Sequence, residues 1–255
     1  MSHGPNPGGA PAVPAGAVIT KAPVRVRHRT VARALVATHV IQPGEDLVAV
    51  ARRYLGPHVG PGDIAVLGQK LVSICQGRLV PLERVSVGPA ARLLSRTVRA
   101  TPHGLGLGRP ETMAMAVREV GWGRILRATL AGAMDRLHGR HGAFYRVAGP
   151  RVWAIDGPGP ETLPPYDRSI VLAPDDPDGV ARRVARALGV PVAVVDVNDL
   201  EAAVLGASPG IDRDLVREAL RDNPMGQGRA QTPLGWLTPV ADPRPTGEGS
   251  RYPAR

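Results

Sequence analysis

The sequence has one cysteine, two lysines and few aromatic residues. Cys75 stands alone among 255 residues, which excludes an intramolecular disulfide framework and a zinc site built on cysteines. With 3 Trp, 4 Tyr and 1 Phe, the chain offers few rings on which the bases of single-stranded nucleic acid could stack. No apolar run approaches the roughly 18 residues that cross a bilayer, and the mean hydropathy is -0.07.

The N-terminal segment also lacks the features of a secretory signal. Its first twenty residues are rich in Gly, Pro and Ala and carry neither a basic n-region nor a clear apolar h-region. We therefore expect a cytoplasmic protein with no membrane partner. Residues 1–22 and 241–255 are expected to be disordered arms, and residues 23–240 to fold. A hydrophobic content of 43% is enough for a packed core, while 31 Gly and 27 Pro predict many turns.

Almost all of the positive charge is arginine. Lys21 and Lys70 are the only lysines, and 32 basic against 22 acidic side chains give a net charge of +10. Residues 1–155 hold 21 basic and 7 acidic side chains, whereas residues 156–222 hold 7 and 13. This division fits a chain that binds an anion and a cation together, and it equally fits two ordinary solvated surfaces. Nucleic-acid binding through the basic part is a further interpretation of the charge.

Capping residues and apolar spacing predict helices and strands along the chain. Helices are predicted after Asp46, from Pro110 to Gly121, over about 124–138, after Asp176, and over about 212–221. Buried strands are predicted at 64–67 and 192–195, and a last strand around 234–237. Basic and apolar residues alternate from Lys21 to Arg33, which predicts one early strand with a basic face. The segment 144–166 is predicted to contain turns and short strands, including 151–155.

The clearest candidate for metal chemistry follows the strand at 192–195. Asp196 stands at its carboxyl end, where ligands bind in α/β sheets, and Asn198, Asp199 and Glu201 come next. Carboxylate and amide oxygens suit Mg²⁺ or Mn²⁺. The alternative is a loop in which Asn198 and Asp199 bond to their own backbone.

Other polar residues give weaker signals. Lys70 directly follows a predicted strand, so it is either a phosphate-binding charge or an exposed loop lysine. His103 precedes a glycine-dense segment that matches neither a Rossmann fingerprint nor a Walker loop. The pair His138 and His141 flanks a glycine, which argues against a shared metal-binding face. Cys75 is interpreted as a small buried apolar residue.

Three segments in order resemble the coenzyme F-420 gamma-glutamyl ligase family. Residues 63–78 (DIAVLGQKLVSICQGR) are similar to its "GDvlvvtsKivSkaeGR" segment, and residues 42–47 (QPGEDL) are similar to its opening "xPGDDL". Met225-Gly226-Gln227, followed by Pro233, resembles its "mGQadEgvP" loop. The resemblance spans about residues 38–238.

The resemblance implies a mixed α/β (α+β) fold and an intertwined homodimer. It also implies GTP-dependent ligation of L-glutamate to a phosphorylated deazaflavin precursor, with Mg²⁺ or Mn²⁺ and a monovalent cation such as K⁺; for a divergent member we expect GTP or ATP. By position, Gln69 and Lys70 are expected to contact the nucleotide, together with the loop of Gly226, Gln227 and Gly228. Asp196 matches the family's metal-binding aspartate, and Gln227 matches a residue of the nucleotide and metal loop.

The chain departs from the family pattern at several positions. Ile74 replaces a second lysine, Val197 replaces the threonine after the metal aspartate, and Ala230 aligns with the loop glutamate. The family segment with its other metal aspartate is replaced by the glycine run, so Glu111 is the only acid placed to substitute for it. The expected metal ligands are therefore Glu111, Asp196 and Gln227.

These observations leave three hypotheses. The first is a divergent member of the family that acts as a nucleotide- and metal-dependent amide ligase. The second is a non-catalytic protein that binds a nucleotide or cofactor and has kept the fold. The third is a basic nucleic-acid-binding protein, which the scarcity of aromatic residues argues against.

Overall fold

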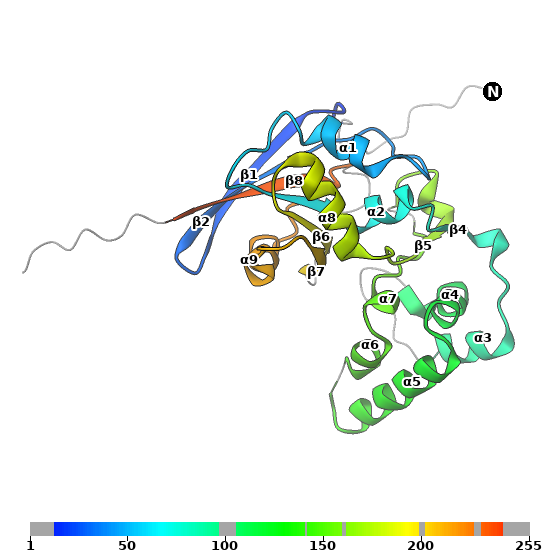
Figure 1. Cartoon of the computed structure of the whole chain (residues 1–255). Coiled ribbons are helices and arrows are strands. Elements are labelled where there is room, and N and C mark those ends of the chain that lie inside the picture. The colour runs from blue at the N-terminus through cyan, green and yellow to red at the C-terminus, as the bar shows by residue number, and fades with distance from the viewer. Residues whose placement is uncertain are drawn as a thin grey trace, which may run out of the picture.

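The computed structural model describes residues 13–96, 106–140, 142–159, 162–198, 202–226 and 231–241. Of the residues discussed above, His103, His141, Asp199, Glu201, Gln227, Gly228 and Ala230 lie outside these ranges. A six-stranded mixed sheet in the order β1-β2-β8-β3-β6-β7 forms the centre of one part of the molecule (Figure 1). Its strands are β1 (Val18–Val26), β2 (Arg29–Val36), β3 (Ile64–Gly68), β6 (Val192–Val197), β7 (Ala202–Ala207) and β8 (Leu234–Ala241).

The two central strands β3 and β6 run parallel and are buried on both faces. Ala65 and Leu67 of β3 pack in one core with α1 (Leu47–Tyr54), α2 (Gln69–Cys75) and α8 (Pro177–Leu188). Val66 points to the opposite face, where α9 (Arg213–Ala219) packs. Because successive side chains alternate between two covered faces, the sequence of such a strand is a continuous apolar run.

A second part of the molecule consists of helices that pack on a core of their own. The chain leaves the first part through β4 (Leu79–Pro81) and returns through β5 (Ser169–Val171), and these two strands pair with each other. Between them lie the elements α3 (Pro89–Ser95), α4 (Pro110–Val120), α5 (Trp122–Leu137), α6 (Ala143–Ala148) and α7 (Pro150–Trp153). Figure 1 shows these helices beside the sheet, and we call α3–α7 the helical unit.

Short 3-10 turns complete the described elements at Leu82–Arg84, Gly106–Gly108 and Tyr166–Arg168. Within the described ranges, no helix has the length and apolar character that would let it cross a bilayer.

Most predicted helices are confirmed, with their caps. The Asp46 carboxylate accepts a hydrogen bond from the Val48 amide at 2.8 Å at the start of α1, and Asp176 caps α8 through the Gly179 amide at 3.0 Å. The Asp212 side chain does the same for α9. Gly121, with φ 81°, ends α4. Each cap satisfies amides that have no partner within the helix.

The prediction of one basic strand before residue 36 was wrong. β1 and β2 form a hairpin that turns at Arg27, which has φ 54°. Residues 18–22 therefore belong to the sheet rather than to the arm expected over 1–22. Arg33 is not on an exposed basic face, because its side chain is only 3% exposed. It reaches beneath the sheet toward α9, where it binds the Ala219 carbonyl oxygen and the Asp222 carboxylate.

The short strands predicted within 144–166 are helices instead. Phe144 and Ala148 of α6 are one helical turn apart, and they are buried in the helical unit together with Val152 of α7. The alternation around Trp153 resembles a strand, but Pro150 starts a helical turn there. Strand β7 was not predicted. Its Gly206 lies so close to Pro177 that an added Cβ would stand 2.2 Å from the Pro177 carbonyl carbon.

Ion pairs within the fold join some arginines of the basic part of the sequence to carboxylates of the acidic part. Arg33 binds Asp222, Arg27 lies 3.3 Å from Asp212, and Arg151 lies 2.7 Å from Asp175. Each of these pairs joins the basic part of the sequence to the acidic part. Part of the arginine excess therefore serves the fold itself.

Candidate active site

A cavity of about 850 Å³ opens at one edge of the six-stranded sheet. The carboxyl ends of β2, β3 and β6 and the start of β8 meet there, because β8 runs antiparallel to β2 and β3. Residues 38–41, 68–71, 195–198 and 231–233 line the cavity from this side. The helical unit and the segment after it contribute the opposite wall with Tyr145, Arg146 and residues 152–157. This is the edge at which parallel α/β sheets bind ligands.

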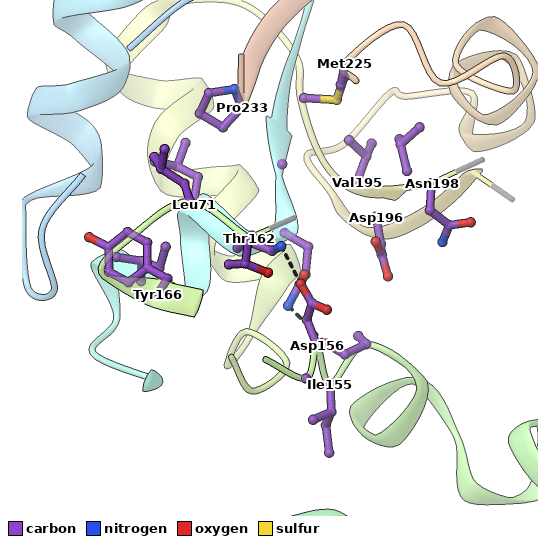
Figure 2. Close-up of a pocket in the computed structure, with 18 of the residues that line it drawn as sticks. Leu71, Ile155, Asp156, Thr162, Tyr166, Val195, Asp196, Asn198, Met225 and Pro233 are labelled. Carbon is purple, nitrogen blue, oxygen red and sulfur yellow. Dashed lines mark hydrogen bonds and ion pairs between the residues drawn. The ribbon is translucent and has the colours of Figure 1, made fainter. Parts of the chain in front are cut away.

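Asp196 lines this cavity, as the position at a strand end predicts. It lies near the end of β6 and is opposite Ala203 of β7. Asn198 follows two residues later and also lines the cavity. Figure 2 shows both side chains at the same end of β6. The carboxylate and the amide together offer hard oxygen ligands.

Lys70 lines the same cavity and forms an ion pair with Asp156. Lys70 belongs to the first turn of α2, so it is not a loop lysine. Figure 2 marks the pair by a dashed line at the Asp156 carboxylate. The two side chains are 41% and 43% exposed, so both can be reached from the cavity. Two carboxylates, Asp156 and Asp196, therefore share one cavity with a lysine.

Gln69 is buried and is held by protein groups. Its side-chain amide donates to the Ala154 carbonyl oxygen at 3.0 Å and to the Leu172 carbonyl oxygen at 3.3 Å. It lines the cavity beside Lys70, and it ties the start of α2 to the segment after α7. Its expected contact with a nucleotide stays a prediction.

The remaining predicted site residues divide into two groups. Gly226, with φ 74°, lines the cavity, whereas Gln227 and Gly228 lie outside the described residues. Glu111 lies in the first turn of α4 and is not among the residues that line the cavity. Within the described ranges, no three His, Cys, Asp or Glu side chains are arranged to hold a metal ion.

The comparison with protein families agrees with this geometry. The model of the F420-0:Gamma-glutamyl ligase family matches residues 35–212, well over half of the chain. The chain belongs to this family. No curated protein gives a significant match. The family supports a ligase of small-molecule substrates, and the mixed fold agrees with the expected one.

The family match covers most of the cavity. It contains Lys70, Asp156 and Asp196 and ends at Asp212. The segment with Gly226, which the sequence resemblance included, lies beyond this match but still lines the cavity. Two of the departures from the ligase family pattern, Ile74 and Val197, also line it. They place apolar side chains where the family pattern has a lysine and a threonine.

Asp156 and His39 are among the cavity residues that the sequence did not point to. Asp156 lies in a loop rich in Gly and Pro, and its backbone pairs with Val171 of β5, far along the chain. His39 lies just before the segment that resembles the family's opening motif. Its Nδ1 is 2.7 Å from the Tyr54 hydroxyl and its Nε2 is 2.9 Å from the Glu45 carboxylate. Both ring nitrogens are thus engaged by the protein, which indicates that His39 shapes the cavity wall of this ligase family member.

The charges around Glu45 affect two neighbouring groups. Burial, and then the negative charge of Glu45, raises the pKa of Tyr166 above its usual value. The Tyr166 hydroxyl donates a hydrogen bond to the Ile41 carbonyl oxygen, which suits a protonated phenol. Burial, followed by the charges of Glu45 and Asp46, raises the pKa of the Cys75 thiol to about 12.

Cys75 is therefore expected to resist thiol reagents in the native state. At pH 8 a thiol with this pKa is ionised in only about one molecule in ten thousand, and the thiolate is the reactive form. Reaction with a disulfide reagent should be negligible in the folded protein and complete in denaturant. Rapid modification of the native protein at pH 8 would contradict the environment described for Cys75.

Proposed function

We propose that this chain is a nucleotide- and divalent-cation-dependent amide ligase that joins L-glutamate to a phosphorylated deazaflavin precursor or a related acceptor. One observation carries the proposal: Lys70, Asp156 and Asp196 line a single cavity at the ligand-binding edge of the sheet. A ligase of this kind needs a cationic group for phosphates and carboxylates for the metal that accompanies them. The family match supports the reaction class.

The donor set fits Mg²⁺ or Mn²⁺. Asp156, Asp196 and the Asn198 amide supply oxygen atoms, and Mg²⁺ usually takes one or two carboxylates and completes its shell with water and substrate phosphates. In the proposed metal site, Asp156 therefore takes the place that the sequence resemblance gave to Glu111. The cation would neutralise charge on the transferred phosphoryl group. We also propose that K⁺ and the loop of residues 226–228 take part in nucleotide binding.

The chain's own residues suggest how the reaction would be organised. The precursor carboxylate takes the terminal phosphoryl group of GTP or ATP, and the nucleoside diphosphate leaves. The glutamate amine then attacks the acyl phosphate, loses its proton, and releases inorganic phosphate as the amide forms. Lys70 would hold phosphate oxygens as a point charge. To do so it would exchange its contact with Asp156 for one with the substrate, which releases that carboxylate toward the cation.

The test is turnover. The purified protein with Mn²⁺, L-glutamate, the deazaflavin precursor and GTP or ATP should release diphosphate and phosphate in proportion to amide formed. Omission of either the glutamate or the precursor should abolish the amide. A protein that binds nucleotide with Mn²⁺ but forms no amide with any carboxylic acceptor would contradict the ligase function.

A non-catalytic binding protein is the second candidate. The observation in its favour is that Ile74 and Val197 put apolar side chains into the cavity at positions where the family pattern is polar. Such a protein would bind the nucleotide or the deazaflavin without turnover. The same assay separates the two functions, because binding without release of diphosphate is its expected result.

We also propose that the protein self-associates through one face of α5. Trp122, Leu126, Leu130, Met134 and Leu137 recur at helical spacing on α5 and are 46–81% exposed. Residues three or four positions apart lie about one turn from each other on the same side of a helix, so these side chains form a continuous apolar stripe. Contiguous exposed apolar surface of several large side chains is typical of interaction sites.

A second copy of the chain is the occupant that fits this stripe. Each sequence segment outside the described ranges holds at most two large apolar side chains, too few to cover five. Two α5 helices that pair antiparallel about Leu130 would set Leu126 against the partner's Met134, so one patch serves both copies, as twofold symmetry requires. A standard interface buries about 800 Å² per partner, and the five side chains would supply the centre of such a patch.

Replacement of Leu130 by aspartate should therefore give a monomer. A charge at the centre of an apolar interface should raise the dimer dissociation constant by at least about 30-fold. Sedimentation equilibrium measures this change, and Leu93→Asp provides the control, because Leu93 is 64% exposed on α3 and lies outside the stripe. A wild-type protein that is monomeric at high micromolar concentration, or an L130D variant that still dimerises, would contradict the assignment.

A further inference from the structure

Four charged side chains form a closed network where the helical unit meets the sheet. The Glu119 carboxylate lies 2.6 Å from an Arg78 nitrogen and 3.0 Å from an Arg151 nitrogen. Asp175 contacts the same two arginines, each at 2.7 Å. Each acid therefore touches both bases and each base touches both acids. We call Arg78, Glu119, Arg151 and Asp175 the charge square.

Glu119 is placed where an isolated carboxylate would be unfavourable. It lies in the last turn of α4, whose dipole repels negative charge there, and its side chain is only 12% exposed. Two guanidinium groups offset both costs, and charge-assisted hydrogen bonds of this kind are stronger than neutral ones. Arg78 is also largely buried, at 15% exposure, and its Nε donates to the Ala173 carbonyl oxygen.

The charge square joins the two connections between the parts of the molecule. Arg78 directly precedes β4, and Asp175 lies between β5 and α8, so both belong to the crossing segments. Glu119 and Arg151 come from α4 and α7 of the helical unit (Figure 1). Gln76 adds two hydrogen bonds at 2.8 Å to the Asp175 backbone. The square thus fixes the orientation of the helical unit at its attachment.

The same segments carry the charged residues of the cavity. Lys70 lies in the first turn of α2, which ends three residues before Arg78, and Asp156 follows Arg151 by five residues. Asp156 is also held by two backbone hydrogen bonds with Val171, at 2.8 and 2.9 Å. Those bonds fix its backbone relative to β5, but they leave α7 and the rest of the helical wall to be oriented by other contacts.

We propose that Glu119 is a positioning residue: through Arg78 and Arg151 it sets the helical wall of the cavity so that Asp156 meets Lys70. The effect of Glu119 on catalysis rests on the proposed function, whereas its effect on the Lys70–Asp156 contact does not. Loss of Glu119 leaves Asp175 as the carboxylate that both arginines share and removes the link from α4 to the crossing segment. The helical wall around Asp156 then shifts, and the Asp156 side chain meets Lys70 less often, although its backbone stays paired with Val171.

Carbodiimide cross-linking of the full-length protein tests this directly. The reagent activates a carboxylate and joins it to a nearby lysine amine as an amide, while the carbodiimide takes up the lost water as a urea. Because Lys21 and Lys70 are the only lysines, a Lys70–Asp156 cross-link is readily identified by peptide mass spectrometry. Its yield should fall about fivefold in a Glu119→Gln, Arg151→Gln double variant, and nearly as much in either single variant, since the square acts as one unit.

Two controls separate positioning from general loss of stability. Arg217→Gln removes an exposed ion pair on α9, and Asp212→Ala removes the α9 cap, which should cost about 1 kcal/mol. Both should cross-link like wild type at 20 °C. An unchanged yield in the double variant, an equal loss in the controls, or no cross-link in wild type would each overturn the proposal. Since no ligand is used, the result is independent of whether the protein proves to be a ligase.

Discussion

Replacement of Asp196 by asparagine is expected to weaken Mn²⁺-dependent nucleotide binding by about 100-fold. Substitution of groups that merely support metal ligands already lowers affinity about 10- to 100-fold, and among the described residues Asp196 and Asp156 are the carboxylates that line the cavity. Asparagine keeps the shape and one oxygen, so the strand end should stay folded. Calorimetric titration of a GTP analogue, with and without Mn²⁺, measures the effect.

Asp156→Asn distinguishes the two carboxylates. It should also weaken binding with Mn²⁺, but it removes the partner of Lys70. Nucleotide binding without the cation should therefore stay the same or become tighter in this variant, while Asp196→Asn should leave it unchanged. Glu218→Gln, an exposed change on α9, is the control. Equal binding by wild type and Asp196→Asn in the presence of Mn²⁺ would remove Asp196 from the site.

Arg33→Met is expected to produce the largest loss of stability, about 3–5 kcal/mol. The guanidinium donates to the Ala22 carbonyl oxygen at 2.7 Å and the Ala219 carbonyl oxygen at 2.9 Å, and it pairs with Asp222. Methionine fills the space but leaves these acceptors without a donor. For a chain of this size, the melting temperature should fall by about 10 °C. Arg29→Met, an exposed arginine of the same strand, should change it little.

The dependence of this loss on pH has a defined sign. The hydrogen bond from Arg33 lowers the pKa of Asp222 below its usual value. A lowered pKa stabilises the folded state above the ordinary aspartate pKa of about 4, and this stabilisation is lost as the pH falls through the lowered value. Because the Asp222 side chain is 58% exposed, the carbonyl contacts carry most of the effect. Urea unfolding at pH 7 and pH 3 should therefore show a destabilised variant at both, and equal stability of wild type and Arg33→Met at pH 7 would contradict this account.

Local signals in the sequence were sufficient for much of the fold. Asp46 and Asp176 cap their helices because a cap depends on side chains and amides within a few residues. The segments 64–67 and 192–195 are strands because both of their faces are covered, and a continuous apolar run signals this. Asp196 and Lys70 reach the cavity because the ends of β6 and β3, two parallel strands, meet at one edge.

Contacts between distant segments account for what was missed. Asp156 meets Lys70 only through the return of the chain along β5, and no local pattern marks it. The local sequence around Arg33 is that of an exposed strand residue, and its partner Asp222 lies 189 positions later in the chain. The charge division was interpreted as an anion with a cation or as two solvated surfaces, whereas several arginines of the basic part instead bind carboxylates of the acidic part. This internal pairing weakens the case for nucleic acid.

The most direct test of the central claim is a crystal structure of the protein with Mn²⁺ and a non-hydrolysable GTP analogue, recorded at the manganese absorption edge. We predict an anomalous peak in the cavity between the Asp156 and Asp196 carboxylates, with nucleotide phosphates beside Lys70. An anomalous peak and nucleotide elsewhere in the molecule, or an empty cavity at saturating concentrations of both, would contradict the account.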